Sequence, residues 1–122
     1  MDRGLSIRRQ VMGHAFVDKA LTRAADTPAW PLQEHITEHV WGAVWSRDGL
    51  DRRSRSIATL SILVALRAHE ELVGHTRAAL TNGLTREEIV ELVIHASAYC
   101  GAPAALSAMR VVESSFSSLT ES

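Results

Sequence analysis

The proline and glycine residues are the feature that most restricts how this chain can fold. Only three prolines and seven glycines occur among 122 residues, and almost all of them stand near plausible helix ends. Alanine and leucine abound, whereas isolated alternating runs of β-branched residues are missing. This pattern predicts helices, because proline and glycine interrupt helices and alternating β-branched residues indicate strands. We therefore expect an all-α fold, a compact bundle of about six helices in one domain that spans residues 1–122.

Apolar spacing and local breaks predict the positions of these helices. Asp26-Thr27-Pro28 should end a first amphipathic helix, Asn82-Gly83 supplies a left-handed stop, and Gly101-Ala102-Pro103 forms a corner. We expect a frayed tail from about residue 117, after helices over residues 5–25, 31–45, 51–68, 69–80, 85–100 and 103–116.

Three of the predicted helices carry a more specific signal. The second helix places Ile36, Val40 and Val44 at four-residue spacing. The fifth begins with Thr85-Arg86-Glu87-Glu88, a capping box, and its buried stripe should contain Ile89, Leu92, Val93 and Ala96. The third is apolar on most sides from Ile57 to Ala68, and one small domain can surround such a helix only partly. We therefore expect other subunits to help cover it.

Charge and cysteine content exclude several classes of protein. Thirteen basic and fourteen acidic residues leave a net charge of −1, which indicates neither a nucleic-acid partner nor a membrane surface. The single cysteine, Cys100, cannot form an internal disulfide, and the first residues lack the apolar run of a signal peptide. No stretch reaches the length of a membrane span. These features predict a cytoplasmic protein.

Glu71 and His75 are the first candidates for chemistry. They stand four residues apart on a predicted helix, where a carboxylate can hold the proton and orientation of an imidazole. Such a pair can serve as a general acid. Surface Glu and His pairs at this spacing are also common without any catalytic role.

Basic residues gather at the start of the third predicted helix. Arg52, Arg53 and Arg55 stand there beside Ser56, although the positive end of a helix dipole disfavours cations. A guanidinium fork can clamp a carboxylate, and the serine hydroxyl can add a hydrogen bond. The cluster therefore indicates an anionic ligand, acidic partners across a subunit contact, or, for some of its members, a solvated face.

Other reactive side chains give weaker signals. His35-Ile36-Thr37-Glu38-His39 matches the H-x-x-E-H pattern of inverted zinc peptidases, but a solvated helix face is the better interpretation and we expect no metal site. Cys100 has no C-x-x-C partner and is readily explained as a small buried residue. The remaining candidates have structural explanations as helix, core or interface residues, and they are His14, His95, Trp30, Trp41 and Trp45.

Several spaced motifs together resemble one family. The chain resembles the carboxymuconolactone decarboxylase family, and in particular its 4-carboxymuconolactone decarboxylase branch, from about residue 8 to residue 112. The matching stretches are Trp41-Gly42-x-Val44-Trp45-x-Arg47-x-Gly49-Leu50, Arg55-Ser56 with Thr59-Leu60, Glu71-Leu72-x-x-His75, Asn82-Gly83-Leu84-Thr85-x-Glu87-Glu88-Ile89, and Tyr99-Cys100-Gly101-Ala102-Pro103-Ala104-Ala105.

The resemblance implies a fold and an assembly. It implies an all-helical, AhpD-like domain that forms homotrimers or trimer-based hexamers. In the peroxidase-like relatives a C-x-x-C pair precedes the family histidine, whereas Ala68 and Glu71 occupy those positions here. Peroxidase activity is therefore disfavoured.

The resemblance also implies the loss of carbon dioxide from a dicarboxylated lactone during the breakdown of protocatechuate, without a metal or an organic cofactor. The partner would be a small anionic lactone or keto acid. Arg55 and Arg52 would clamp its remaining carboxylate, and His75 held by Glu71 would deliver a proton. Further substrate contacts are predicted for Ser56, Trp45, Tyr99 and Cys100.

Some polar positions depart from the pattern of this branch. The departures, together with Lys19, are His14, Phe16, Glu38, Ala43, Leu106 and Arg110. They leave two alternatives open beside the decarboxylase. One is a relative that catalyses proton transfer or cyclisation on a different small substrate in a biosynthetic pathway, and the other is a non-catalytic oligomeric binding protein.

Overall fold

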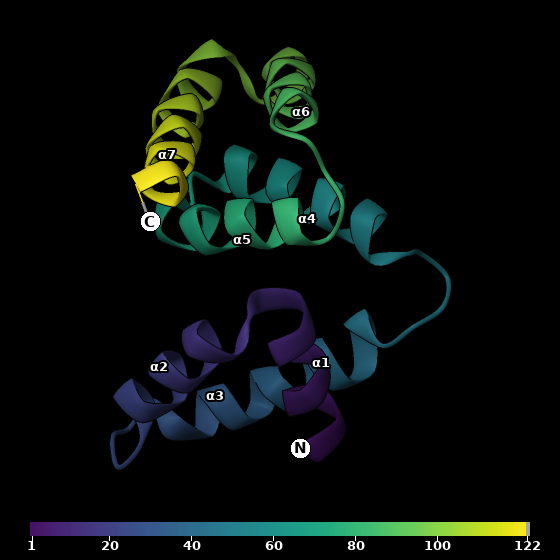
Figure 1. Cartoon of the computed structure of the whole chain (residues 1–122), viewed down its shortest axis with the longest axis vertical. Helices are drawn as coiled ribbons and strands as arrows, with labels where there is room; N and C mark the ends of the chain where they lie inside the picture. Colours follow the sequence, from purple (N-terminus) through teal and green to yellow (C-terminus); the bar gives the residue numbers. More distant parts are fainter. Residues whose placement is uncertain (122) are drawn as a thin grey trace. The chain divides into compact units, whose positions relative to one another are not determined.

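The structure, a computed structural model, describes the backbone of residues 1–121 and the side chains of residues 1–119 (Figure 1). Within this range the chain forms seven α-helices and one π-helical segment and has no strand. The all-α prediction is therefore confirmed. The elements are α1 (Asp2–Met12), α2 (His14–Ala24), α3 (Trp30–Ile36), η1 (Thr37–Trp45), α4 (Arg52–Leu66), α5 (His69–Thr81), α6 (Arg86–Cys100) and α7 (Ala102–Glu121).

The chain divides into two compact units. Unit 1 is Met1–Arg52 and contains α1, α2, α3 and η1, whereas unit 2 is Arg53–Ser122 and contains nearly all of α4 and the helices that follow it. The expectation that the two act as a single domain stays a prediction.

The first predicted helix is two helices. Residue 13 is a glycine with φ of +93°, a conformation that ends α1, and α2 begins at the next residue. Arg9 and Asp18 form an ion pair of 2.5 Å across this junction. The predicted continuity over residues 5–25 was wrong, because the apolar spacing extends across a glycine that leaves the helical conformation. The predicted break at Asp26-Thr27-Pro28 is confirmed, and Asp26 has a φ of 59°.

The second predicted helix continues α3 into the π-helical segment η1. Its buried side chains are Thr37, Trp41 and Trp45, whereas Val40 and Val44 are exposed. The stripe of Ile36, Val40 and Val44 therefore does not face the interior. The buried stripe repeats at the same four-residue spacing one position later, so the spacing alone did not decide which of the two stripes packs.

Helix α1 packs closely against η1 through two glycines. A Cβ atom added to Gly4 would lie 1.9 Å from the carbonyl oxygen of Thr37 and 3.1 Å from the amide nitrogen of Gly42. One turn further along α1, the buried Arg8 donates hydrogen bonds from Nη1 to Gln33 Oε1 at 2.9 Å and to Thr37 Oγ1 at 3.1 Å. Burial lowers the pKa of the Arg8 guanidinium, because the charged form loses its hydration.

Unit 2 holds a continuous apolar core. Helices α6 and α7 pack against each other, and α7 also packs against α5 (Figure 1). The predicted stripe of α6 is buried in this core. The core residues are Leu60, Val64, Leu72, Ala79, Leu84, Ile89, Leu92, Val93, Ala96, Ala105, Ala108 and Val112.

Helix α4 contributes only one stripe to this core. Its buried residues are Ser56, Leu60 and Val64, at four-residue spacing. On other sides of the helix, Ile62 is 58% exposed and Leu66 is 70% exposed. As predicted, α4 carries more apolar side chains than one chain covers, and the remainder are exposed.

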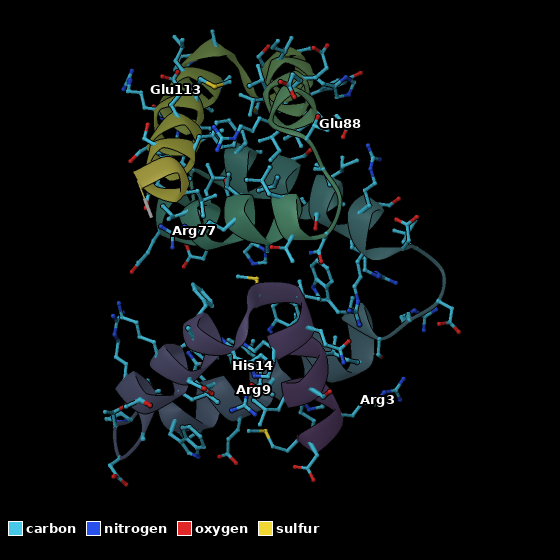
Figure 2. All side chains as sticks on the ribbon, viewed as in Figure 1. Arg3, Arg9, His14, Arg77, Glu88 and Glu113 are labelled. Atoms are coloured by element: carbon cyan, nitrogen blue, oxygen red, sulfur yellow. The ribbon has the colours of Figure 1, made fainter. Side chains whose placement is uncertain are left out.

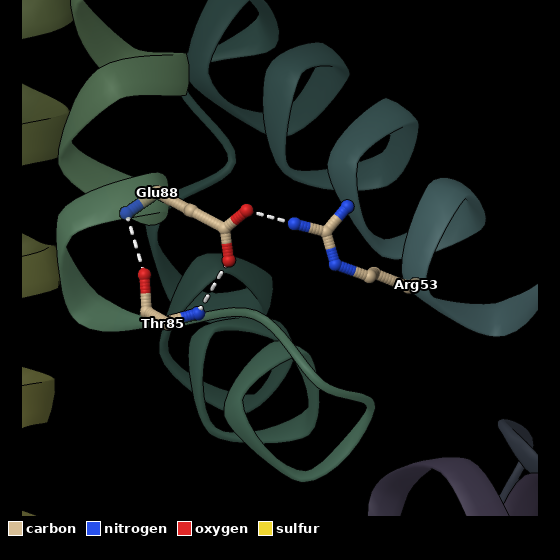
Figure 3. A network of polar contacts seen from close by, with 3 residues as sticks. All are labelled: Arg53, Thr85 and Glu88. Atoms are coloured by element: carbon tan, nitrogen blue, oxygen red, sulfur yellow. Dashed lines mark hydrogen bonds and ion pairs between the residues drawn. The ribbon is translucent and has the colours of Figure 1, made fainter.

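The predicted end of α5 and the predicted start of α6 are confirmed by their hydrogen bonds. Gly83 has a φ of +106°, and the amide of Leu84 donates to the carbonyl of Ala79 at 3.0 Å, which closes α5. The Thr85 hydroxyl accepts from the amide of Glu88, and the Glu88 carboxylate accepts from the amide of Thr85 (Figure 3). The last helix begins at Ala102 and reaches Glu121, beyond its predicted end.

Candidate active site

Glu71 and His75 lie one turn apart on α5. Glu71 is exposed in the first turn of the helix, and His75 is half-buried in the next. The spacing that suggested a general acid is therefore present on a regular helix. The contact between carboxylate and imidazole, and the catalytic role of the pair, stay predictions.

The basic residues at the start of α4 have different surroundings. Arg53 forms an ion pair with Glu88, the residue of the capping box, and therefore links the start of α4 to the start of α6 (Figure 3). Ser56 is buried, and its hydroxyl accepts a hydrogen bond from Asn82 Nδ2 at 3.2 Å. Arg55 is half-buried on the same helix. Arg53 thus has a structural partner, and Ser56 fixes the end of α5 in addition to any contact with substrate.

A cavity of about 330 Å³ lies within unit 1 and contains two of the residues predicted to bind substrate. Trp45 forms part of its wall and is only 8% exposed, with its ring stacked on that of Trp41 at 5.0 Å between centroids. Arg52 lies at the rim and donates from Nη2 to Gln10 Oε1 at 2.7 Å. The lining residues are Arg3, Ile7, Trp45, Ser46, Arg47, Asp48, Leu50, Asp51 and Arg52.

The charges of this cavity are unequal. Three arginines outnumber two aspartates, so the lining carries one net positive charge beside an apolar wall. Two of these arginines, Arg3 and Arg47, were not predicted as site residues; Arg3 is exposed on α1 (Figure 2). Arg47 stands in the Trp-x-Arg motif of the sequence, which was a usable signal. Arg3 comes from a distant helix, and nothing in the local sequence marks it.

Tyr99 and Cys100 end α6 and have contrasting environments. Tyr99 is 82% exposed, and its ring lies 5.3 Å from that of His95, centroid to centroid. Cys100 is half-buried and packs against the core of unit 2, as expected for a small apolar residue. A role for either residue in substrate binding stays a prediction.

The histidines of the H-x-x-E-H pattern face each other on an exposed surface. The rings of His35 and His39 lie 4.4 Å apart between centroids, across the junction of α3 and η1. Among the residues described, no three His, Cys, Asp or Glu side chains gather closely enough to hold a metal ion. In the same range, no helix has the length and apolar character needed to cross a membrane.

Comparison with known proteins identifies the family. Residues 31–114 match the carboxymuconolactone decarboxylase family. The chain is 44% identical over 121 residues to a nitrosuccinic acid decarboxylase of Metarhizium robertsii, covering 98% of this chain and 83% of that protein. It is 40% identical over 116 residues to a 4-carboxymuconolactone decarboxylase of Acinetobacter baylyi, covering 95% of this chain and 86% of that protein. The chain belongs to the carboxymuconolactone decarboxylase family. Its identity of 40–44% to two decarboxylases over nearly the whole chain also supports a carboxy-lyase.

The positions that depart from the branch pattern of the carboxymuconolactone decarboxylase family are all exposed, and none of them lines the cavity of unit 1. Arg110 instead contributes to a separate surface hollow of about 400 Å³ between α5 and α7. These seven positions therefore lie outside the lining of the unit 1 cavity. The positions are His14, Phe16, Lys19, Glu38, Ala43, Leu106 and Arg110.

Proposed function

We propose that this enzyme is a cofactor-independent decarboxylase of a small dicarboxylic acid, either 4-carboxymuconolactone or a close chemical relative such as nitrosuccinate. The observation that carries the proposal is the identity of 40–44% to two decarboxylases over nearly the whole chain. Both named substrates lose a carboxylate from a carbon that is bonded to a strongly electron-accepting group.

The reaction needs a place for the electrons of the broken carbon–carbon bond. In 4-carboxymuconolactone they enter the unsaturated lactone and form a dienolate, and in nitrosuccinate they enter the nitro group and form a nitronate. A proton must then be added to carbon to complete either product. We assign this proton to His75, with Glu71 holding the imidazole, because these are the acid and carboxylate at helical spacing on α5.

The substrate also retains one carboxylate, which needs a fixed cationic partner. We assign it to Arg55 and Arg52, which stand three residues apart at the start of α4 and so share a side of that helix. A guanidinium can hold a carboxylate through two parallel hydrogen bonds, which fixes its orientation as well as its position. An apolar wall such as Trp45 would disfavour the charge on the carboxylate that leaves.

The direct test is an assay of carbon dioxide release by the purified protein. We expect either 4-carboxymuconolactone or nitrosuccinate to be decarboxylated faster than in buffer, without added metal and in the presence of EDTA. Product formed in D₂O should carry one deuterium with a single stereochemistry, because an enzymatic acid delivers the proton to one face. No rate above buffer with either compound at micromolar enzyme would contradict the proposal.

We further propose that the protein is a homotrimer or hexamer in which apolar side chains of α4 are covered by other subunits. The exposure of Ile62 and Leu66 supports this, since contiguous apolar surface on a soluble protein usually marks a contact. Light scattering at micromolar concentration should give three or six times the mass of one chain, and Leu66→Lys should lower that mass. Thr22→Lys, an exposed substitution on α2, is the matched control. A single-chain mass for the unmodified protein would contradict the proposal.

A further inference from the structure

The two substrates named among the relatives share more than an acceptor group. In nitrosuccinate, the carbon that loses carbon dioxide carries a carboxymethyl arm, –CH₂–COO⁻. In 4-carboxymuconolactone, the ring carbon that carries the departing carboxylate bears the same arm. Both molecules are therefore 2-substituted succinates, and the substituent that accepts electrons is the part that differs. An enzyme for either compound needs a binding site for the constant part, the arm.

The cavity of unit 1 has the properties that such an arm requires. Its volume of about 330 Å³ is within the range of small-molecule sites. Three arginines supply charge-assisted donors at its rim, and the two aspartates reduce the net charge to that of one positive group, which matches one carboxylate. Trp45, Ile7 and Leu50 supply apolar surface for the methylene group.

Local contacts hold part of this lining in place. Trp45 is buried at the end of η1 and stacked on Trp41, so close packing holds this part of the cavity wall. Arg52 is tied to Gln10 of α1, and Arg3 and Ile7 stand one turn apart on that same helix. Helix α1 is in turn fixed to η1 by the close approach at Gly4. The three arginines of the lining thus come from α1, from the short segment between η1 and α4, and from the first residue of α4.

We propose that the unit 1 cavity binds the carboxymethyl arm of a 2-substituted succinate, whose carboxylate is the one retained in the reaction, with Arg47 and Arg3 as its partners beside Arg52 and in place of Arg55, which does not line the cavity. The inference rests on the proposed decarboxylase function and extends it by naming the substrate class and two residues. The enzyme should accept different acceptor groups at the 2-position and should require the arm.

An enzyme–substrate double-mutant cycle tests this assignment. The substrates are nitrosuccinate and 2-nitropropanoate, in which a methyl group replaces the arm, each corrected for its spontaneous rate. Arg47→Met should lower kcat/KM for nitrosuccinate by about tenfold to a hundredfold, the usual effect of losing a hydrogen bond to a charged group. It should change kcat/KM for 2-nitropropanoate by less than about threefold. Arg3→Met should have the same selective effect.

Two further variants serve as controls for charge and for position. Asp48→Asn removes an acidic group from the lining and should lower KM for nitrosuccinate. This effect on substrate binding is opposite in direction to that of the arginine variants. Arg23→Met replaces an exposed arginine of α2 outside the cavity. It should leave kcat/KM unchanged for both substrates. If the arginine variants reduce turnover of both substrates equally, or leave both unchanged, the assignment of the arm is wrong.

Binding of succinate separates failure of this inference from failure of the proposed reaction. Calorimetric titration should show that succinate binds the unmodified protein more tightly than propanoate does, and that Arg47→Met and Arg3→Met remove this preference. If no compound is decarboxylated but the preference and its loss are seen, the cavity assignment holds and the reaction is wrong. If decarboxylation occurs and both variants retain the preference, the cavity assignment is overturned. Circular dichroism of each variant checks that it is folded.

Discussion

Replacing His75 with alanine is expected to lower kcat for decarboxylation by about a hundredfold to ten-thousandfold, the range that a positioned general acid contributes. Protonation of the dienolate or nitronate carbon would then depend on water. KM should change much less, because the retained carboxylate is assigned to arginines and not to the imidazole. Steady-state kinetics of carbon dioxide release, with circular dichroism to confirm the helical fold, measures both effects.

The same helix offers a matched control for this experiment. His69 lies on a different side of α5, where it lines the hollow shared with α7. His69→Gln should therefore leave kcat within about threefold of the unmodified enzyme, and Glu71→Gln should give an intermediate loss, since it removes only the orienting charge. A His75→Ala variant that keeps its full kcat would exclude His75 as the proton donor, whatever the outcome for His69.

The largest expected effect on stability comes from Gly4→Ala. The added methyl group would lie 1.9 Å from the carbonyl oxygen of Thr37, and a backbone atom cannot move away as a flexible side chain can. Helix α1 would have to shift from η1, with a cost of about 3 kcal/mol in the free energy of unfolding. For a domain of this size, thermal unfolding should then occur about 10 °C or more below that of the unmodified protein.

Gly49→Ala is the control for this substitution. A Cβ atom at residue 49 meets no atom within 4 Å, so its effect should stay within about 0.5 kcal/mol. Differential scanning calorimetry of the two variants separates close packing from the general effect of removing a glycine. Equal midpoints for Gly4→Ala and Gly49→Ala would show that α1 and η1 are not held in the contact described.

The helices could be predicted from sequence where their ends depend on neighbouring residues. The capping box of Thr85 and Glu88 and the left-handed stop at Gly83 were predicted and are present, because their hydrogen bonds join residues close in the chain. The break at Gly13 was missed, since one glycine within a helical pattern does not reveal its φ angle. The π-helical winding of η1 was also missed, because apolar periodicity is interpreted with an α-helical repeat.

The sequence also named two of the residues that line the unit 1 cavity, and their contact with substrate stays a prediction. Trp45 and Arg52 were both predicted to contact substrate, and they line one cavity. Arg3 was missed because only the fold brings α1 to that cavity. Arg53 belonged to the basic cluster in the sequence, but it pairs with Glu88, a contact across 35 positions of the chain that no local pattern reveals.

The π-helical winding of η1 limits how this chain can change in length during evolution. A π-turn holds one residue more than an α-turn, so η1 corresponds to an α-helix that has accepted an insertion. Deleting an exposed residue such as Ala43 would permit α-helical winding, but it would rotate every later residue of the segment. Trp45 and Arg47 would then leave the cavity wall. Divergence at residue 43 is therefore expected to proceed by substitution and not by deletion.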